Sequence, residues 1–406
     1  MKICGIIAEY NPFHNGHALH LAESRRILGA DTALVCIMSG NFVQRGDLAI
    51  LDKYARAEAA VRGGADLVLE LPLGAALSSA DGFALGGVRA LDALGTVGYL
   101  SFGSECGSAR ALDAAACALD EETVQSALRS ELQKGLSYAA ASQAALARTC
   151  PKTAALLSSP NNTLGVSYCR AIRRARSLLS PLSIARRGVS HDSAAPLGAL
   201  ASASYLRERI ACGDMDSCRN FMPPSSRRLL EQATMQGRVP VLLPSLDQAL
   251  LACLRRLTPE DFARYERPDE GLCNRLAQAI HQNGTFAAAC TEAQTRRYPL
   301  ARVRRAYLRA FLDLPLSATE AAPGYLRVLA IGARGRTLLR LFAETAAVPL
   351  IVKPLHEKQL PDALQPALLR DVLADDLHAL ALPDPRHRAG GSHFRKTPCC
   401  LPDCEV

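Results

Sequence analysis

The chain has 406 residues, 49% of them hydrophobic and 5% aromatic, a length and composition that predict a globular protein of two domains. No stretch approaches the roughly 18 uninterrupted apolar residues of a membrane helix, and the first residues lack the features of a secretory signal, so we expect a cytoplasmic protein without membrane contact. Lys and Arg number 47 against 39 acidic residues, a net charge of +8 that permits a nucleic-acid partner without requiring one.

Strand-like apolar runs recur through the first half of the chain, with helical patterns between them. Residues 54–62 form one such helical pattern, with Asp52 as its N-cap, and residues 83–94 form another, which Gly95 ends. Strands that alternate with helices indicate a doubly wound, parallel α/β sheet. The runs are Ile3 to Ala8, Ala33 to Met38, Asp66 to Leu71, Val97 to Phe102 and Leu182 to Ala185.

The later parts of the chain have a different composition. An Ala-rich span at about 108–160 predicts a helical insertion of two or three helices before the last strand. Beyond residue 210 the strand signals fade, so we expect an α/β domain over 1–212, a mainly α-helical domain over 213–383 and a loose tail over 384–406. The fourteen cysteines are mostly scattered and indicate reduced thiols. Only Cys399, Cys400 and Cys404, with His393, form a weak metal candidate.

The stretch "GIIAEYNPFHNGHALHLAE" places His14 and His17 where the first strand gives way to a helix. In an open parallel sheet, ligands bind beyond the carboxyl ends of the strands. Free backbone N–H groups and the helix dipole favour phosphate there, and imidazole donors can stabilise charge that develops on it. Gly16 would let a flat base approach the backbone. The alternatives are a pair of surface histidines at a turn and a zinc site that lacks an evident third ligand.

The ordered blocks of the first half resemble one family. His14-Asn15-Gly16-His17 matches the His-x-Gly-His signature of the nucleotidyltransferase superfamily. Together with "MSGNFVQRGDLAILDKYARAEAA", "GGADLVLELP", "FGSE" and "SPNNTLGVSYCRAI", it resembles the bacterial tRNA(Met) cytidine acetate ligases, firmly over residues 1–210 and loosely beyond. The resemblance implies a nucleotidyltransferase fold. It also implies that ATP activates acetate to acetyl-adenylate, and that the acetyl group passes to the wobble cytidine of elongator tRNA(Met).

The resemblance also implies site residues. His14 and His17 would contact the phosphates during adenylation, and Arg45, in the loop "SGNFVQRG", would neutralise the charge of acetate or pyrophosphate; a solvated turn is the alternative for that loop. Mg²⁺ is expected with ATP. A plain turn explains Gly103 equally well, and helix capping explains one of Asn161 and Asn162. The residues that would bind ATP are Ile7, Ala8, Glu9, Tyr10, Asn11, Pro12, Phe13, His14, Asn15, Gly16, His17, His20, Gly103, Asn162, Arg186 and Arg187.

Two further elements are candidates for substrate contacts. "ASASYLR" resembles the Ser-x-Thr-x-x-Arg element of nucleotidyltransferases, and Ser202, Ser204 and Arg207 would contact the triphosphate, with a helix cap as the alternative. A basic stretch in the second half suits a tRNA loop, although such arginines also cover apolar surface with their stems. It comprises Arg296, Arg297, Arg302, Arg304, Arg305 and Arg309, interleaved with Tyr298 and Tyr307; "ARGRTLLR", residues 333–340, is a weaker second patch.

Two other functions compete with the tRNA-modifying ligase. A coenzyme-biosynthetic adenylyltransferase would use the histidine motif but leaves the long basic second half without a role. A nucleotide-dependent RNA-binding protein would use both halves without turnover. The sequence does not predict the oligomeric state.

Overall fold

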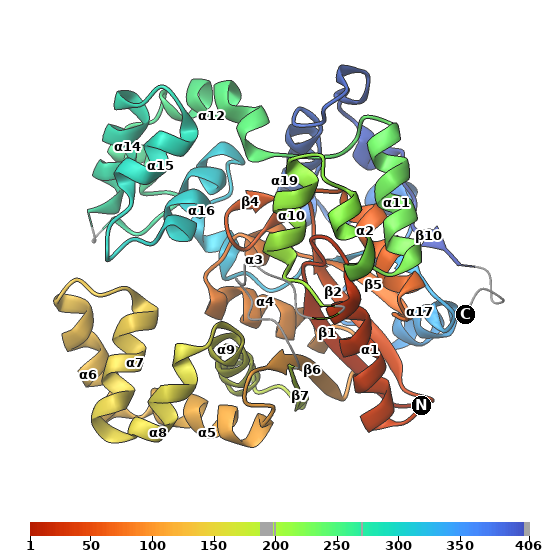
Figure 1. The fold of residues 1–406 in the computed structure, drawn as a ribbon, viewed down its shortest axis with the longest axis horizontal. Helices are drawn as coiled ribbons and strands as arrows, with labels where there is room; N and C mark the ends of the chain where they lie inside the picture. Colours follow the sequence, from red (N-terminus) through yellow and green to blue (C-terminus); the bar gives the residue numbers. More distant parts are fainter. Residues whose placement is uncertain (187–197, 199, 269–270, 402–406) are drawn as a thin grey trace.

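The computed structural model describes residues 1–186, 198, 200–268 and 271–401. Within these residues one large sheet has the strand order β10-β8-β5-β2-β1-β6-β7, with β9 paired to β8 at the side (Figure 1). A separate two-stranded hairpin follows β2. The strands are β1 (Ile3–Ala8), β2 (Ala33–Ser39), β3 (Phe42–Val43), β4 (Asp47–Leu48), β5 (Leu67–Leu71), β6 (Tyr99–Ser104), β7 (Ser180–Ala185), β8 (Leu326–Ile331), β9 (Leu350–Ile351) and β10 (Cys399–Cys400).

The five strands expected from the first half form the parallel core of the sheet. Strand β1 pairs with β2 from Ile3↔Ala33 onward and with β6 on its other edge. Strands β5 and β7 extend the sheet outward, again in parallel. The doubly wound α/β prediction is therefore confirmed.

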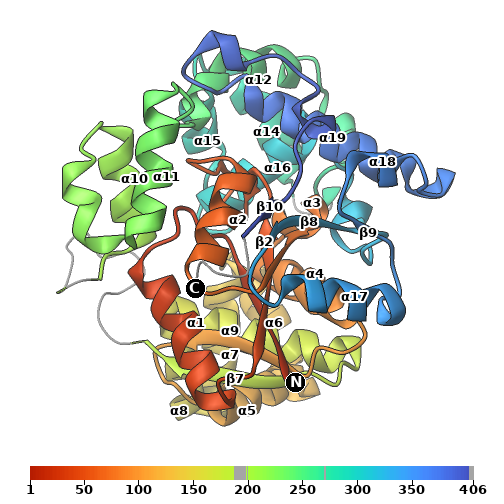
Figure 2. The ribbon, with the colours of Figure 1, turned by 90° about the vertical axis from the view of Figure 1, so that its right-hand side faces the viewer.

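Helices cover both faces of the sheet. Alternate residues of each strand point to opposite faces, so each strand contributes to two apolar cores. Ile3 and Ile7 of β1 join a core formed with α4, α5, α9 and α17. Cys4 and Ile6 join a core on the other face, formed with α1 and α2. In Figure 2, α1 and α2 lie on one side of β1 and β2, and α4 and α17 lie on the other. Strands buried on both faces explain why the first half reads as near-continuous apolar runs.

The helices of the first half lie between the strands and in the inserted span. The span of about 108–160, where we expected an insertion of two or three helices, contains α5, α6, α7 and the short α8. The α2 prediction is correct, since Asp52 Oδ1 accepts hydrogen bonds from the N–H groups of Tyr54 and Ala55 at 3.0 and 3.2 Å. The helices of the first half are α1 (Asn15–Leu28), α2 (Lys53–Arg62), α3 (Leu73–Ala76), α4 (Ala80–Asp92), α5 (Ala109–Asp120), α6 (Glu122–Gln133), α7 (Tyr138–Thr149), α8 (Pro151–Ala154), α9 (Pro160–Ala175) and α10 (Ala203–Ala211).

The second half is mainly helical, and a bundle of α12 to α16 has its own apolar core against the β3–β4 hairpin. Short 3₁₀ turns include η7 (Pro385–His387) and η8 (Ser392–Phe394). The α-helices are α11 (Pro224–Met235), α12 (Asp247–Leu254), α13 (Pro259–Phe262), α14 (Leu272–Gln282), α15 (Phe286–Ala293), α16 (Leu300–Phe311), α17 (Gly335–Thr345), α18 (Pro354–Glu357) and α19 (Gln365–Ala379).

The second half also returns to the sheet, which the fading strand signals did not predict. Strand β8 pairs antiparallel with β5, with Leu67 opposite Ile331, and β10 pairs with β8. Residues 384–401 are therefore not the loose tail that we expected, because β10 and the buried His393 fix them to the body of the protein. The boundary at residue 213 stays a prediction.

The described part of the chain has neither a membrane-spanning helix nor a metal-binding cluster. None of its helices combines the length and apolar character needed to cross a bilayer. Within it, no three His, Cys, Asp or Glu side chains are grouped to hold a metal ion. Cys404 of the weak tail candidate lies outside the described residues, whereas the His393 ring contacts Asp375 at 2.6 Å.

Candidate functional site

The His-x-Gly-His turn lies at the point where the strand order of the sheet reverses. β1 pairs with β2 on one side and with β6 on the other, and the turn connects the carboxyl end of β1 to α1. In open parallel sheets this position holds the ligand crevice. The amino end of α1 contributes backbone N–H groups and the positive end of the helix dipole there, both of which favour an anion.

The two histidines form the N-terminal cap of α1. His14 is the N-cap residue, and its Nδ1 accepts a hydrogen bond from the N–H of Gly16 at 3.0 Å. The His17 Nδ1 accepts from the N–H of His14 at 3.3 Å. The rings stack with centroids 3.7 Å apart. Because Nδ1 of each ring accepts a main-chain hydrogen bond, the proton of a neutral ring lies on Nε2.

The loop before the cap is held by main-chain contacts. Asn11 Oδ1 accepts from the N–H of Ile50 at 2.9 Å, and Arg207 Nη1 donates to the Asn11 carbonyl oxygen at 2.8 Å. Glu9 Oε1 accepts from the N–H of Gln44 at 2.7 Å. Arg207 therefore lies beside the loop, and its contact with a triphosphate stays a prediction. Ser202 caps α10 by accepting from the N–H of Tyr205, the alternative that the sequence left open.

Arg56 of α2 is a supporting residue that the sequence analysis missed. Its side chain is 0% exposed and donates to the carbonyl oxygens of Glu9, Ser39 and Leu51 at 2.5, 3.1 and 2.9 Å, and also to that of Gly40. Burial lowers its pKa to about 10. One guanidinium thus connects the loops that follow β1 and β2. The signal in the sequence was a cation within the apolar face of the predicted helix.

Several predicted ATP-binding residues have their side chains inside the protein. Tyr10 and Phe13 are buried between β1 and α2, and the Tyr10 hydroxyl contacts Cys36 Sγ at 3.3 Å. Burial raises the pKa of Tyr10 well above its ordinary value. Ile7 packs against α4, where a Cβ on Gly87 would be 2.4 Å from Ile7 Cδ1. Tyr10 and Phe13 thus support the loop from the protein interior. Because the Ile7 side chain packs against α4, only the main chain of Ile7 can contact a ligand.

The loop after β6 lies at the same edge of the sheet, because β6 is the parallel neighbour of β1. Glu105 accepts from the N–H of Asn162 and from Nδ2 of Asn161 at 2.8 and 2.6 Å, and Asn162 Oδ1 accepts from the N–H of Cys106 at 3.0 Å. Burial raises the pKa of Glu105, but these hydrogen bonds outweigh it and the pKa is lowered. Both asparagines therefore have structural partners, and Glu105 is a second supporting residue that we missed.

Three more predicted residues lie together near this loop. A Cβ on Gly103 would be 3.3 Å from Arg186 Cγ, so the two residues are adjacent. His20 Nε2 contacts Ser101 Oγ of β6 at 2.9 Å. Burial, and to a smaller degree the charge of Arg186, lowers the pKa of His20 to about 4, so its ring is neutral at pH 7. Arg187 lies outside the described residues.

Comparison with known proteins identifies the family. The model of the HIGH nucleotidyl transferases matches residues 1–392. The tRNA(Met) cytidine acetate ligase of Acetivibrio thermocellus is 38% identical over 97% of this chain and 98% of its own length. The chain belongs to the tRNA(Met) cytidine acetate ligase family. The ligase of Halothermothrix orenii is 35% identical over 97% of this chain and 98% of its own.

A solved structure of the same family shows the same fold. Thermotoga maritima TmcAL bound with alpha-thio ATP superposes with a TM-score of 0.91 at 30% identity, over 99% of this chain and 100% of that one. The resemblance inferred from the ordered motifs is thereby confirmed over nearly the whole length, including the second half, where the motifs gave only a loose match.

In this member of the cytidine acetate ligase family, the β3–β4 hairpin carries Arg45 at an exposed position of its turn. Helix α16 packs against the hairpin, because Arg305 Nη1 donates to the Gln44 carbonyl oxygen at 2.8 Å and Arg304 lies 3.8 Å from Asp47. The second half therefore supports a loop of the predicted site.

The interpretation of α16 as a tRNA surface needs correction. Arg305 and Arg309 are buried, and Arg309 forms an ion pair with Glu266 at 2.9 Å. Tyr298 and Tyr307 are also buried, and the Tyr307 hydroxyl donates to the Leu276 carbonyl oxygen. The sequence pattern was misleading because one face of an amphipathic helix can bury arginines when a carboxylate and carbonyl oxygens receive them. Only the outer residues, such as Arg296, remain exposed.

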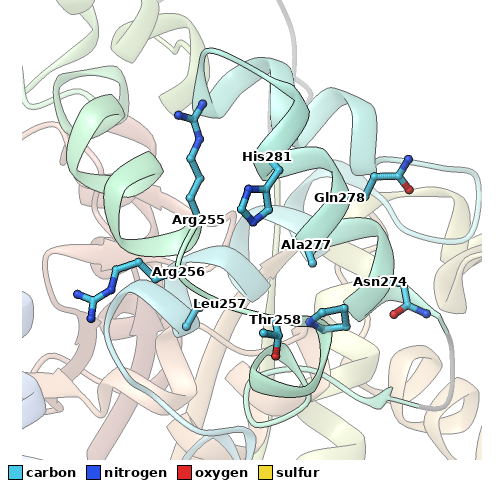
Figure 3. A pocket seen from close by; sticks show the side chains of 9 residues that line it. Arg255, Arg256, Leu257, Thr258, Asn274, Ala277, Gln278 and His281 are labelled. Carbon is cyan, nitrogen blue, oxygen red and sulfur yellow. The ribbon is translucent and has the colours of Figure 1, made fainter.

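The helical bundle has a surface depression of its own, away from the His-x-Gly-His turn. It has a volume of about 420 Å³ and lies between α12, α13 and α14 (Figure 3). Arg255, Arg256 and His281 line it, with Asn274 and Gln278 farther along α14. Arg255 donates to the carbonyl oxygens of Ile280 and Asn283 at 3.2 and 2.8 Å, so its guanidinium holds the end of α14.

Proposed function

We propose that this protein uses ATP to acetylate the wobble cytidine of elongator tRNA(Met) to N4-acetylcytidine in the cytoplasm. The observation that carries the proposal is the double-histidine cap of α1, which stands at the amino end of a helix at the switch point of the sheet. The name of the curated relatives supplies the substrate, and the alpha-thio ATP bound to the Thermotoga maritima protein supports ATP as co-substrate.

The first step is the activation of acetate. A carboxylate oxygen attacks the α-phosphorus of ATP, the bond to the β-phosphate oxygen breaks, and acetyl-adenylate and pyrophosphate form. Negative charge grows on the phosphates as this bond breaks. His14, His17 and the N–H groups of α1 would stabilise that charge, and Arg45 would neutralise acetate or pyrophosphate.

The nucleotide would lie between the two loops that the structure brings together. The main chain of residues 7–13 and the start of α1 form one side, with Asn15, Gly16 and His20 on the helix. Gly103, Asn162 and Arg186 form the other, and Arg187 follows them in sequence. Mg²⁺ would enter on the phosphates of ATP, because this ion is held mainly by substrate phosphates and water with few protein ligands.

The second step transfers the acetyl group to RNA. The cytidine N4 amine attacks the acetyl carbon, the mixed anhydride bond breaks, AMP leaves and the amine loses a proton. Because acetyl-adenylate reacts with water, the crevice has to exclude solvent until the tRNA arrives.

The test is incubation of the purified protein with ATP, labelled acetate and bulk tRNA in the absence of coenzyme A. We expect label in tRNA, as N4-acetylcytidine, with one AMP and one pyrophosphate released per acetyl group. Pyrophosphate release that requires a phosphorylated small molecule instead of acetate would identify a coenzyme-biosynthetic adenylyltransferase. RNA binding without pyrophosphate release would identify a protein without turnover.

A further inference from the structure

The carboxyl-terminal segment 385–396, "PRHRAGGSHFRK", has an unusual charge. It contains three arginines, one lysine and two histidines, and no carboxylate. Contrary to expectation it is folded, with the short turns η7 and η8. In Figure 1 this dark blue segment lies beside α11 and α19.

The segment is anchored from its inner side. His393 is 0% exposed, and its Nδ1 contacts Asp375 Oδ2 of α19 at 2.6 Å. Arg327 of β8 lies 2.5 Å from its other ring nitrogen. The N–H of Gly391, at a φ of 76° that suits glycine, donates to Asp376 Oδ1 at 2.7 Å. One side of a short peptide is thus fixed against the protein, and its outer side is held in a defined conformation.

Three exposed residues of the segment, Arg388, Phe394 and Arg395, provide an aromatic ring and two cations. Phe394 is 49% exposed although it follows directly after the buried His393. The Arg395 guanidinium donates to the Gly390 carbonyl oxygen at 3.0 Å, and that of Arg388 donates to the carbonyl oxygens of Leu382 and Pro383. Within the part of the chain that the structure describes, no carboxylate pairs with either arginine. We call Arg388, Phe394 and Arg395 the tail surface.

The surroundings of the tail surface connect it to the candidate site. Lys396 and Arg238 lie 3.4 and 3.5 Å from the two oxygens of Asp52, the N-cap of α2. Two residues earlier, the N–H of Ile50 donates to Asn11 of the loop before the His-x-Gly-His turn. Residues 50–52 thus contact both the loop at the candidate site and Lys396, which follows Arg395 of the tail surface.

We propose that the tail surface binds RNA, with Arg388 and Arg395 on phosphates and Phe394 stacked on an unpaired base. This inference rests on the proposed function and names the part of the chain that holds the tRNA. Unpaired bases of RNA loops stack on exposed aromatic side chains, and arginines pair with the adjacent phosphates. The helical bundle fits less well, because Tyr298 and Tyr307 are buried and the residues that line the depression between α12 and α14 include no Phe, Tyr or Trp.

The experiment compares full-length variants for two activities. Acetate-dependent exchange of pyrophosphate into ATP, without tRNA, measures adenylation alone, and the Kd for tRNA is measured at several salt concentrations. We expect Phe394→Ala to raise the Kd about 5- to 100-fold without changing its salt dependence, since stacking carries no charge. Phe394→Tyr should restore binding and Phe394→Leu should not. Arg388→Ala with Arg395→Ala should lower the slope of log K against log salt by about 1 to 2.

A matched control removes the same charge elsewhere. Arg129→Ala with Arg148→Ala changes two exposed arginines of α6 and α7, and should leave the tRNA affinity unchanged. All variants should keep wild-type exchange and thermal stability, because the tail surface lies outside the core. Sedimentation of each variant shows whether the surface serves a second copy of the chain.

The outcomes separate this inference from the proposed function. If the wild-type protein acetylates tRNA and the tail variants bind tRNA equally well, the inference is overturned and the function stands. If Arg256→Ala with His281→Ala weakens tRNA binding and the tail variants do not, the RNA binds at the helical bundle and the inference is also overturned. A change in oligomeric state instead of tRNA affinity would assign the surface to a protein partner. Absence of acetate-dependent exchange in the wild type would reject the function itself.

Discussion

Gly16→Ala tests the role of the histidine cap with the smallest change that the site allows. A Cβ at this position would lie 2.9 Å from Cε1 and 3.1 Å from Nδ1 of His14. Carbon atoms in contact are separated by about 3.5 to 4.0 Å. The His14 ring therefore has to move by about 0.5 to 1 Å, away from the N–H of Gly16 and out of its stack on His17.

The magnitude follows from this displacement. A misplacement of about 1 Å costs roughly 100-fold in rate, so we expect adenylation to fall about 10- to 100-fold. Alanine stabilises a helix by about 0.5 to 1 kcal/mol relative to glycine, and loss of the cap costs about 1 kcal/mol. Because these terms oppose each other, the free energy of unfolding should change by less than about 1 kcal/mol.

The assay is acetate-dependent exchange of pyrophosphate into ATP, together with thermal unfolding. The loss should be found in kcat, because the backbone N–H groups of α1 remain available to bind ATP. Gly284→Ala is the matched control, since its added Cβ meets no atom within 4 Å. A stable Gly16→Ala protein with wild-type exchange would show that the position of the His14 ring does not matter to the reaction.

Three further predictions test other parts of the site. His17→Ala should lower the exchange rate by about two to three orders of magnitude, the usual loss when a donor to developing charge is removed; wild-type exchange would refute its role. Arg56→Met leaves four loop carbonyl oxygens without their donor and should lower the free energy of unfolding in urea by about 3 kcal/mol or more; an unchanged midpoint would contradict the connecting role. Because the pKa of His20 is about 4 when folded and about 6.5 when unfolded, the unfolded chain binds more protons between these values, and acidification through this window should destabilise the protein. His20→Gln should reduce that fall by about 1 to 2 kcal/mol in unfolding curves from pH 7 to 4.5, and an identical pH profile would show that His20 does not contribute.

The parallel core and the position of the His-x-Gly-His turn could be predicted from the residues alone. Strands buried on both faces need continuous apolar runs, and a helix that begins beside a strand needs a capping side chain, so both features are local and visible in the residues. The five core strands and the Asp52 cap of α2 were correct for this reason.

Which strands lie at the edge of the sheet, and which cations are exposed, depends on contacts between segments that are far apart in the sequence. Strand β8 is stabilised by pairing with β5, which lies far away in the sequence, and β9 and β10 have two residues each, so neither carries a periodic signal. Arg305 and Arg309 of α16, like Arg388 and Arg395 of the tail, are arginines in a basic stretch of the sequence. The first two are buried and the second two exposed, because burial depends on Glu266 and on carbonyl oxygens that other segments bring to α16. A charged side chain can be buried only where a partner receives it, and the sequence around the side chain does not show that partner.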